Sequence, residues 1–294
     1  MLYRRKIALA LLQGFGDKLS LTDFQKLAFL FSEKQSEPSF DFVPYKYGCY
    51  SFQLDRDRQK MVETGLLANK NEWVKNDSRD YVKLLSNLDY RGLLELRKEI
   101  GNMRGDDLIR YVYTNYPYYA IHSTIAAEIL SEEEMESVLD AVPTQEGFCL
   151  FTIGYEGKTI EAYVNQLIQY RVRVLCDVRK NPLSRKYGFS KQALKRIVER
   201  FGISYIHFPD LGISSNKRKG LSTNTDYTAL FDEYERETLP NQRAKLHQIA
   251  DILETNERIA LTCFELDHKA CHRNRVVHAL QKLSGWRHPV KHIS

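Results

Sequence analysis

The fold is decided by a stretch that begins at residue 148, Phe148-Cys149-Leu150-Phe151-Thr152-Ile153-Gly154-Tyr155. A short apolar run that ends at a glycine is typical of a strand buried on both faces. Similar runs follow at 172–178, 204–208 and 259–264, and segments with helical periodicity lie between them. We therefore expect an α/β fold with a mainly parallel sheet and helices on both faces, a Rossmann-like three-layer arrangement.

The chain before this stretch has a different pattern. Amphipathic helices are predicted over 3–13 and 22–33, a further helix over 51–63, and a short hairpin from 66–68 and 72–75. Helices followed by a hairpin predict a winged-helix-like N-terminal domain. With 294 residues, about two domains are expected. We predict a winged-helix-like domain over 1–75, a helical connector over 76–147 that includes a linker at 143–147, and an α/β domain over 148–294.

Composition excludes several protein classes. The chain is 43% hydrophobic and 28% charged, which excludes collagen-like, mucin-like and fully disordered proteins. It contains neither an apolar run of 18 residues nor a signal-peptide pattern, so we expect no membrane span and no secretion. The five cysteines are odd in number and scattered, which favours reduced thiols in the cytoplasm.

Charge is distributed unevenly along the chain. Up to Glu146 there are 19 basic and 23 acidic residues, which leaves 24 basic and 15 acidic residues after it. Seven of the eight histidines also follow Glu146. This asymmetry favours a nucleic acid, DNA more than RNA, or a nucleotide as the partner of the second half, and a solvated basic surface is the alternative. The oligomeric state is left open.

Polar residues gather where each predicted strand ends. Because ligands of open parallel sheets bind beyond the carboxyl ends of the strands, we expect these residues to share one pocket. The expected substrate- or phosphate-binding residues are Gly154, Tyr155, Gly157, Arg179, Asn181, Arg185, His272 and Arg273, together with the loop residues Lys217, Arg218 and Lys219.

Two carboxylates at strand ends, Asp177 and Glu265, are the predicted catalytic groups. One would activate water or stabilise an oxocarbenium ion and the other would move a proton, which suits hydrolysis of a glycosidic bond. Buried ion pairs that only tie the strand ends together are the alternative. A zinc site from Cys263, His268, Cys271 and His272, or a nucleophilic Cys271, is also considered. We expect Cys263 and Cys271 to pack in the core and no metal or other cofactor to bind.

The string TIGYEGKTIE…VLCDVRKNPLSRKYGFS…GISYIHFPDLG…TCFELDHKACHR resembles the domain of unknown function 488 family over residues 148–294. The resemblance implies a compact α/β domain, fused to varied partners and found near nucleic-acid-related and defence genes. It implies no particular reaction. The string FQKLAFLF…FVPYKYGCYS…VETGLL is similar to phage-associated or antitoxin-like winged-helix proteins.

Together these observations predict a protein that processes nucleic acid or nucleotides. The most concrete hypothesis is hydrolysis that removes a base, modified or not, from DNA, in a setting such as phage defence. The alternatives are a non-catalytic DNA- or nucleotide-binding regulatory module, and a metal-dependent phosphodiester hydrolase that uses the same carboxylates.

Overall fold

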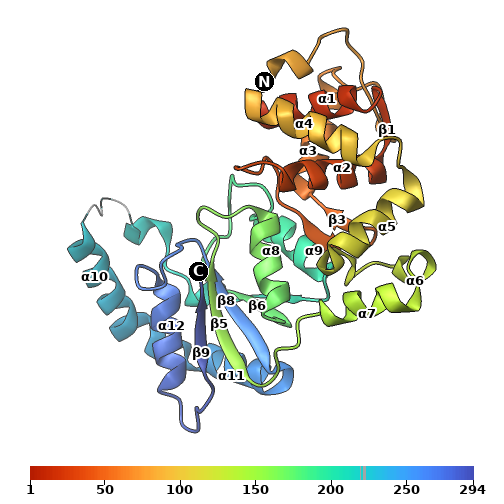
Figure 1. Cartoon of the computed structure of the whole chain (residues 1–294). Coiled ribbons are helices and arrows are strands. Elements are labelled where there is room, and N and C mark those ends of the chain that lie inside the picture. Colours follow the sequence, from red (N-terminus) through yellow and green to blue (C-terminus); the bar gives the residue numbers. More distant parts are fainter. Residues whose placement is uncertain (219, 221–222) are drawn as a thin grey trace. The chain divides into compact units, whose positions relative to one another are not determined.

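The computed structural model of the protein describes residues 1–218, 220 and 223–294. The chain divides into two compact units, residues 1–142 and 143–294, which appear in Figure 1 from red to yellow-green and from green to blue. Each unit has its own hydrophobic core. The division falls at the first residue of the predicted linker, Pro143. Among the described residues, no helix combines the length and apolar character needed to cross a membrane.

The N-terminal unit is mainly helical. Its elements are α1 (Tyr3–Gly14), β1 (Lys18–Ser20), α2 (Leu21–Glu33), β2 (Val43–Tyr45), β3 (Gly48–Tyr50), α3 (Phe52–Glu63), β4 (Glu72–Val74), α4 (Asn87–Ile100), α5 (Gly105–Asn115), α6 (Ala126–Ile129) and α7 (Glu132–Asp140). Serine side chains cap two of these helices: Ser20 and Ser51 accept hydrogen bonds from Asp23 N–H and Leu54 N–H at the starts of α2 and α3.

The predicted hairpin forms, and its second arm has a further partner. Residues 66–68 pair with residues 74–76 through the antiparallel bridge Leu67 to Lys75 and two backbone hydrogen bonds, and β4 also pairs antiparallel with β1. Packing explains the further partner: the pairing with β1 buries Trp73, whose ring stacks on Phe24 of α2 at 3.6 Å. One core extends from Ile7 to Val138, so the ranges that we predicted as a winged-helix-like domain and a connector share their apolar interior.

The C-terminal unit is an α/β domain, as predicted. Its elements are β5 (Cys149–Gly154), α8 (Ile160–Gln169), β6 (Val174–Asp177), α9 (Lys191–Glu199), β7 (Ser204–His207), α10 (Asn224–Glu233), α11 (Arg243–Asn256), β8 (Arg258–Cys263), α12 (His272–Gln281) and β9 (Val290–Ile293). The five strands are all parallel and lie in the order β7-β6-β8-β5-β9.

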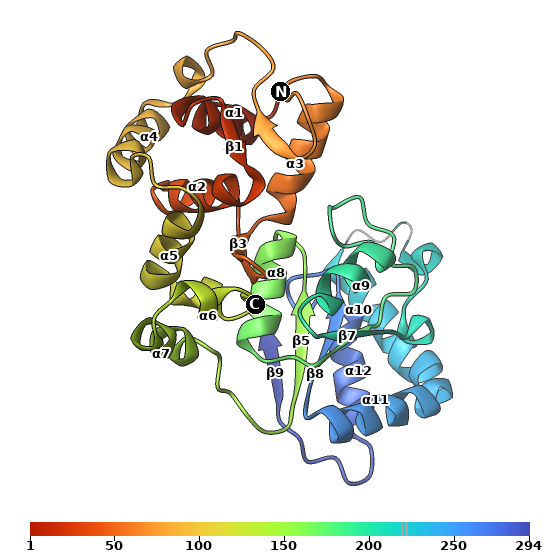
Figure 2. The same cartoon turned by 90° about the vertical axis from the view of Figure 1, so that its right-hand side faces the viewer.

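Helices cover both faces of this sheet (Figure 2). On one face, α11 and α12 pack on side chains that include Val174, Ile259 and Leu261. On the other face lie α8 and α9, and the hydroxyl of Tyr163 on α8 donates to Thr262 of β8. The middle strands β5, β6 and β8 are buried along their whole length, which is why they read as continuous apolar runs. Their carboxyl ends lie at one edge of the sheet, and this edge positions the candidate site.

Candidate functional site

Asp177, at the end of β6, forms a buried network with Arg179. Its carboxylate accepts hydrogen bonds from the Nε and the terminal nitrogen Nη2 of Arg179 at 2.8 and 2.5 Å, and from the hydroxyl of Tyr205 at 2.5 Å. The same guanidinium donates to the Tyr155 hydroxyl at 3.0 Å and to the Phe189 carbonyl at 2.9 Å. Asp177 is 0% exposed and Arg179 is 6% exposed. These contacts tie β5, β6, β7 and the start of α9 together.

This network accounts for most of the hydrogen-bonding capacity of both partners. Burial lowers the pKa of the Arg179 guanidinium, but the hydrogen bonds and charge of Asp177 outweigh it and raise this pKa above its ordinary value. Burial, followed by the charge of Asp177, raises the pKa of Tyr205. This arrangement favours the alternative in which Asp177 forms a buried ion pair that ties strand ends together. A fully buried, paired Asp177 offers no oxygen atom to a ligand at the surface.

The turn after β5, predicted to hold a phosphate, is occupied by the protein's own backbone. The N–H groups of Tyr155 and Glu156 both donate to the carbonyl of Phe264, at 3.1 and 2.9 Å. A Cβ atom on Gly154 would lie 1.9 Å from the Glu265 carbonyl oxygen, so glycine is needed for this close approach. Gly154 and Tyr155 therefore position the segment that carries Glu265, and the exposed residues of this turn are Glu156 and Gly157.

Arg273, in the first turn of α12, acts on the same segment. Its guanidinium donates to the carbonyl oxygens of Glu265 and Leu266. The residue is 1% exposed. Arg273 thus fixes the chain that connects β8 to α12 and is directed at the backbone instead of at solvent.

Glu265 lies within a cluster of thiols and an imidazole. Its Oε2 is 3.2 Å from the sulfur of Cys263 and 2.9 Å from the sulfur of Cys271. The Nδ1 atom of His272 is 3.6 and 3.9 Å from these sulfurs. Both cysteines and His272 are buried, as expected for the cysteines, but Glu265 is only half-buried. The four donor atoms lie within 4.8 Å of one another.

Acid–base properties distinguish the two thiols. Burial raises the pKa of both, but the contact with Cys271 and the His272 imidazole bring the pKa of Cys263 below its ordinary value. The pKa of Cys271 stays above its ordinary value because of burial and the neighbouring Cys263. His272 was predicted to bind substrate or phosphate; in the structure its Nε2 lies 3.0 Å from the carbonyl of Val178.

Exposed basic residues gather along the connection from β6 to α9 and along α9 itself. Residues 179–200 contain eight Lys or Arg residues and a single acid, Glu199. The predicted residues Arg185 and Asn181 are exposed within this segment. Sequence reasoning missed its other cations, although a running charge count would have found them: Lys180, Lys186, Lys191, Lys195, Arg196 and Arg200.

The predicted basic loop is only partly described. Lys217 forms an ion pair with Glu233 of α10 at 2.5 Å, the side chain of Arg218 is not described, and Lys219 lies outside the described residues. A cavity of about 230 Å³ borders this loop. It is lined by Lys180, Asp210, Gly212, Ile213, Ser214, Lys217, Leu230, Tyr234, Thr238 and Gln242. Tyr234 connects the cavity to the cluster, because its ring lies edge-on to His272 with centroids 5.9 Å apart.

Lys158 and Lys186 also lie close to this edge. Burial, together with the charge of Arg273, lowers the pKa of Lys158 to about 8. The amino group of Lys186 donates to the Tyr155 carbonyl at 3.1 Å. Neither lysine was predicted as a site residue: Lys158 is a single cation, and Lys186 belongs to the basic run at 179–200 that a charge count would have found.

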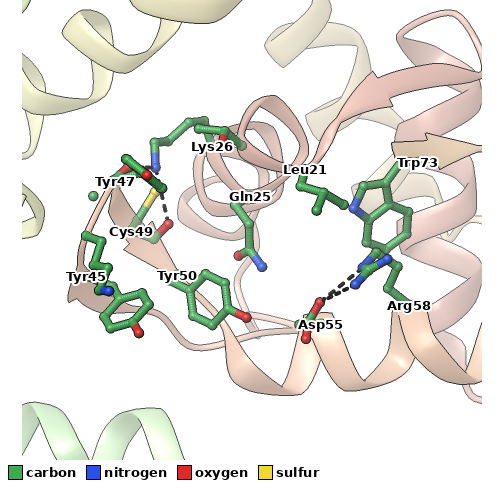
Figure 3. A pocket seen from close by; sticks show the side chains of 13 residues that line it. Leu21, Gln25, Lys26, Tyr45, Tyr47, Cys49, Tyr50, Asp55, Arg58 and Trp73 are labelled. Carbon is green, nitrogen blue, oxygen red and sulfur yellow. Dashed lines mark hydrogen bonds and ion pairs between the residues drawn. The ribbon is translucent and has the colours of Figure 1, made fainter. Parts of the chain in front are cut away.

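The N-terminal unit has a pocket of its own, of about 260 Å³. Figure 3 shows the rings of Tyr45, Tyr50 and Trp73 around it, from the β2–β3 hairpin and from β4. The amino group of Lys26 donates to the carbonyls of Tyr47 and Cys49, and burial lowers its pKa. Aromatic walls around a few polar groups are typical of ligand pockets. The N-terminal unit therefore has a candidate ligand pocket, apart from the site in the C-terminal unit, that the sequence did not indicate.

Comparison with known proteins finds one family match, within the C-terminal unit. Residues 159–280 match the family described as Domain of unknown function DUF488. The C-terminal unit is therefore similar to this family over these residues. The matched residues include α8 through most of α12, and with them Asp177, Arg179 and the whole cluster around Glu265. No curated protein and no solved structure matches the chain.

Proposed function

We propose that the C-terminal unit binds nucleic acid across the β6–α9 connection and helix α9. The observation that carries this proposal is the charge of residues 180–200, where seven basic residues stand against one acid once the buried Arg179 is left out. Arg185, Lys195, Arg196 and Arg200 are exposed, and Arg185 lies at the carboxyl edge of the sheet. A basic stripe of this kind is the electrostatic signature of contact with a phosphate backbone.

We further propose that the domain hydrolyses its bound ligand, with Glu265 as the reacting carboxylate. Support comes from exposure: Glu265 is half-buried at the carboxyl edge, where parallel sheets bind ligands, whereas Asp177 is sealed against Arg179 and Tyr205. This assigns Asp177 to positioning and leaves one carboxylate, so the proposed chemistry is activation of water by Glu265. The five buried thiols suit a reducing compartment, which we propose is the cytoplasm.

Binding is tested by fluorescence anisotropy with labelled single-stranded and duplex DNA at several salt concentrations. A triple variant of the full chain, Arg185→Glu, Lys195→Glu and Arg196→Glu, should bind at least about 10²-fold more weakly at low salt, because binding depends on the number of neutralised phosphates. The control is Arg243→Glu with Lys245→Glu on α11, the helix on the opposite face of the sheet. Affinity that is independent of salt, or equal losses in both variants, would refute the proposal.

Hydrolysis is tested by mass spectrometry of the bases and nucleotides released from modified and unmodified DNA. Glu265→Gln should abolish the release of product and retain affinity for DNA. The change removes the carboxylate that would activate water but leaves the basic residues of 180–200 in place. If no DNA releases any product, the domain is a binding module. If Glu265→Gln releases product at the normal rate, another residue performs the reaction.

A further inference from the structure

The cluster at the start of α12 combines four side chains that bind transition metals. Cys263 ends β8, Glu265 follows it, and Cys271 and His272 begin α12. Two sulfurs, one imidazole nitrogen and one carboxylate oxygen face one another within 4.8 Å. We propose that Cys263, Glu265, Cys271 and His272 form a zinc site. This inference concerns the residues of the cluster alone and stands whether or not the domain binds nucleic acid.

The distances approach those of a tetrahedral zinc centre. With zinc–sulfur and zinc–nitrogen bonds of about 2.3 and 2.1 Å, sulfur and nitrogen ligands lie about 3.6 Å apart. The separations from His272 Nδ1 to the sulfurs of Cys263 and Cys271 are 3.6 and 3.9 Å. The Glu265 oxygen is closer to both sulfurs, at 3.2 and 2.9 Å. Metal binding therefore moves this carboxylate outward by roughly half an ångström, which its half-buried position allows.

The imidazole of His272 is oriented for coordination. A carbonyl oxygen only accepts hydrogen bonds, so the 3.0 Å contact with Val178 places the proton of the neutral ring on Nε2. The lone pair then lies on Nδ1, which faces the two sulfurs. Metal-bound histidines in proteins commonly donate their second nitrogen to a carbonyl or carboxylate in this way. Val178 follows β6, the strand adjacent to β8, so the sheet itself sets the angle of the ring.

The segment that carries Glu265 is held by contacts on both sides. Arg273 donates to the carbonyls of Glu265 and Leu266, and Gly154 lets β5 approach the same backbone closely. The ligands thus come from a strand end, a fixed connection and a helix start, all in place before a metal binds. Such preorganisation is what a metal site requires of its supporting residues.

The ligand set selects zinc over the common hard cations. Two thiolates and an imidazole favour zinc, whereas magnesium and calcium prefer oxygen ligands alone. The zinc alternative weighed from the sequence used His268 as its fourth member. In the structure His268 stacks on His292 with ring centroids 3.6 Å apart, and Glu265 takes the place in the cluster. A carboxylate is an easily displaced fourth ligand, so the same site can present a zinc-bound water to a ligand.

The test measures metal content of the full-length protein by mass spectrometry after expression with added zinc and extensive dialysis. We expect one zinc ion per chain, and we expect cobalt substitution to produce the near-ultraviolet absorption of thiolate-to-cobalt charge transfer. Cys271→Ser should lower zinc affinity by more than about 100-fold, beyond what loss of an outer partner causes. Glu265→Gln, on a half-buried side chain, should retain the fold and lower zinc affinity by at least about 10-fold, the smallest effect expected even of an outer partner.

Cys149→Ala is the matched control, because this buried thiol at the start of β5 lies outside the cluster. It should keep both the zinc and the charge-transfer band. The proposal is overturned if the protein is folded by circular dichroism but retains no zinc and shows no cobalt charge-transfer band. A Cys263–Cys271 disulfide in protein purified without oxygen would also overturn it. Zinc binding without product release from DNA would leave the site standing and refute hydrolysis instead.

Discussion

Replacing Asp177 by asparagine tests whether this carboxylate holds the fold or performs chemistry. The change keeps the size of the side chain but removes the negative charge that faces Arg179. The guanidinium then stays buried, 6% exposed, and keeps only uncharged partners, namely the new amide oxygen, the Tyr155 hydroxyl and the Phe189 carbonyl. Breaking a buried ion pair by removing one partner costs about 3–5 kcal/mol. We therefore expect the C-terminal unit to lose about 4 kcal/mol of its free energy of unfolding.

The loss is measured by urea and thermal unfolding followed by circular dichroism. In a unit of this size, about 4 kcal/mol corresponds to a fall in Tm of about 8–16 °C. The matched control is Asp210→Asn, whose ion pair with Lys180 spans 3.7 Å between half-exposed side chains. An exposed pair contributes at most about 1 kcal/mol, so the control should lose little.

A double variant completes the test. Adding Arg179→Leu to Asp177→Asn removes the unpaired charge, so the combined loss should be smaller than the sum of the two single losses by about 1–3 kcal/mol. If Asp177→Asn is as stable as Asp210→Asn, or if the two changes are additive, the carboxylate does not act through Arg179 and the assignment of Asp177 to positioning fails.

Two further predictions concern the same edge of the sheet. Gly154→Ala should lower the free energy of unfolding of the C-terminal unit by about 1–3 kcal/mol and weaken zinc binding, because its Cβ would lie 1.9 Å from the Glu265 carbonyl. The control Gly157→Ala, in open space at φ +74°, should cost about 1 kcal/mol and leave zinc affinity unchanged. Equal effects of the two variants on zinc affinity would contradict the reasoning. Lys158→Met should stabilise the protein at pH 7. Burial lowers the pKa of Lys158 to about 8, which means that its positive charge destabilises the folded state at pH 7. Between pH 8 and the ordinary lysine pKa the unfolded chain binds more protons than the folded chain, so wild-type stability rises with pH there and the advantage of the variant should shrink. Urea unfolding of both proteins at pH 7 and pH 9.5 measures this difference. An advantage of the variant that grows with pH would contradict the prediction.

The arrangement of the C-terminal strands was largely predictable, because three apolar runs separated by helical periodicity leave few parallel topologies. The runs at 148–153, 172–178 and 259–264 became the middle strands, as their lack of polar positions requires. The pairing of β4 with β1 was not predictable from local pattern. It depends on how Trp73 packs against Phe24, a contact between residues 49 positions apart in the chain.

The candidate site was predictable in its place but not in its detail. Topology alone puts Asp177, Arg179, Glu265 and Arg273 at one edge, yet it cannot tell which groups face solvent. Asp177 and Arg179 are two residues apart and satisfy each other, and Arg273 turns to backbone carbonyls. Whether a charged side chain pairs inside the protein depends on distances of a few tenths of an ångström, which residue spacing does not encode.

The division into two cores has a practical consequence for spectroscopy. The chain has two tryptophans, and each unit contains one of them, Trp73 in the first and Trp286 in the second. Trp73 is 1% exposed and stacked on Phe24, whereas Trp286 is half-buried and donates to the His288 carbonyl at 3.1 Å. A Trp286→Phe protein fluoresces from the first unit alone and a Trp73→Phe protein from the second. Denaturation curves of this pair measure the stability of each half within the intact chain.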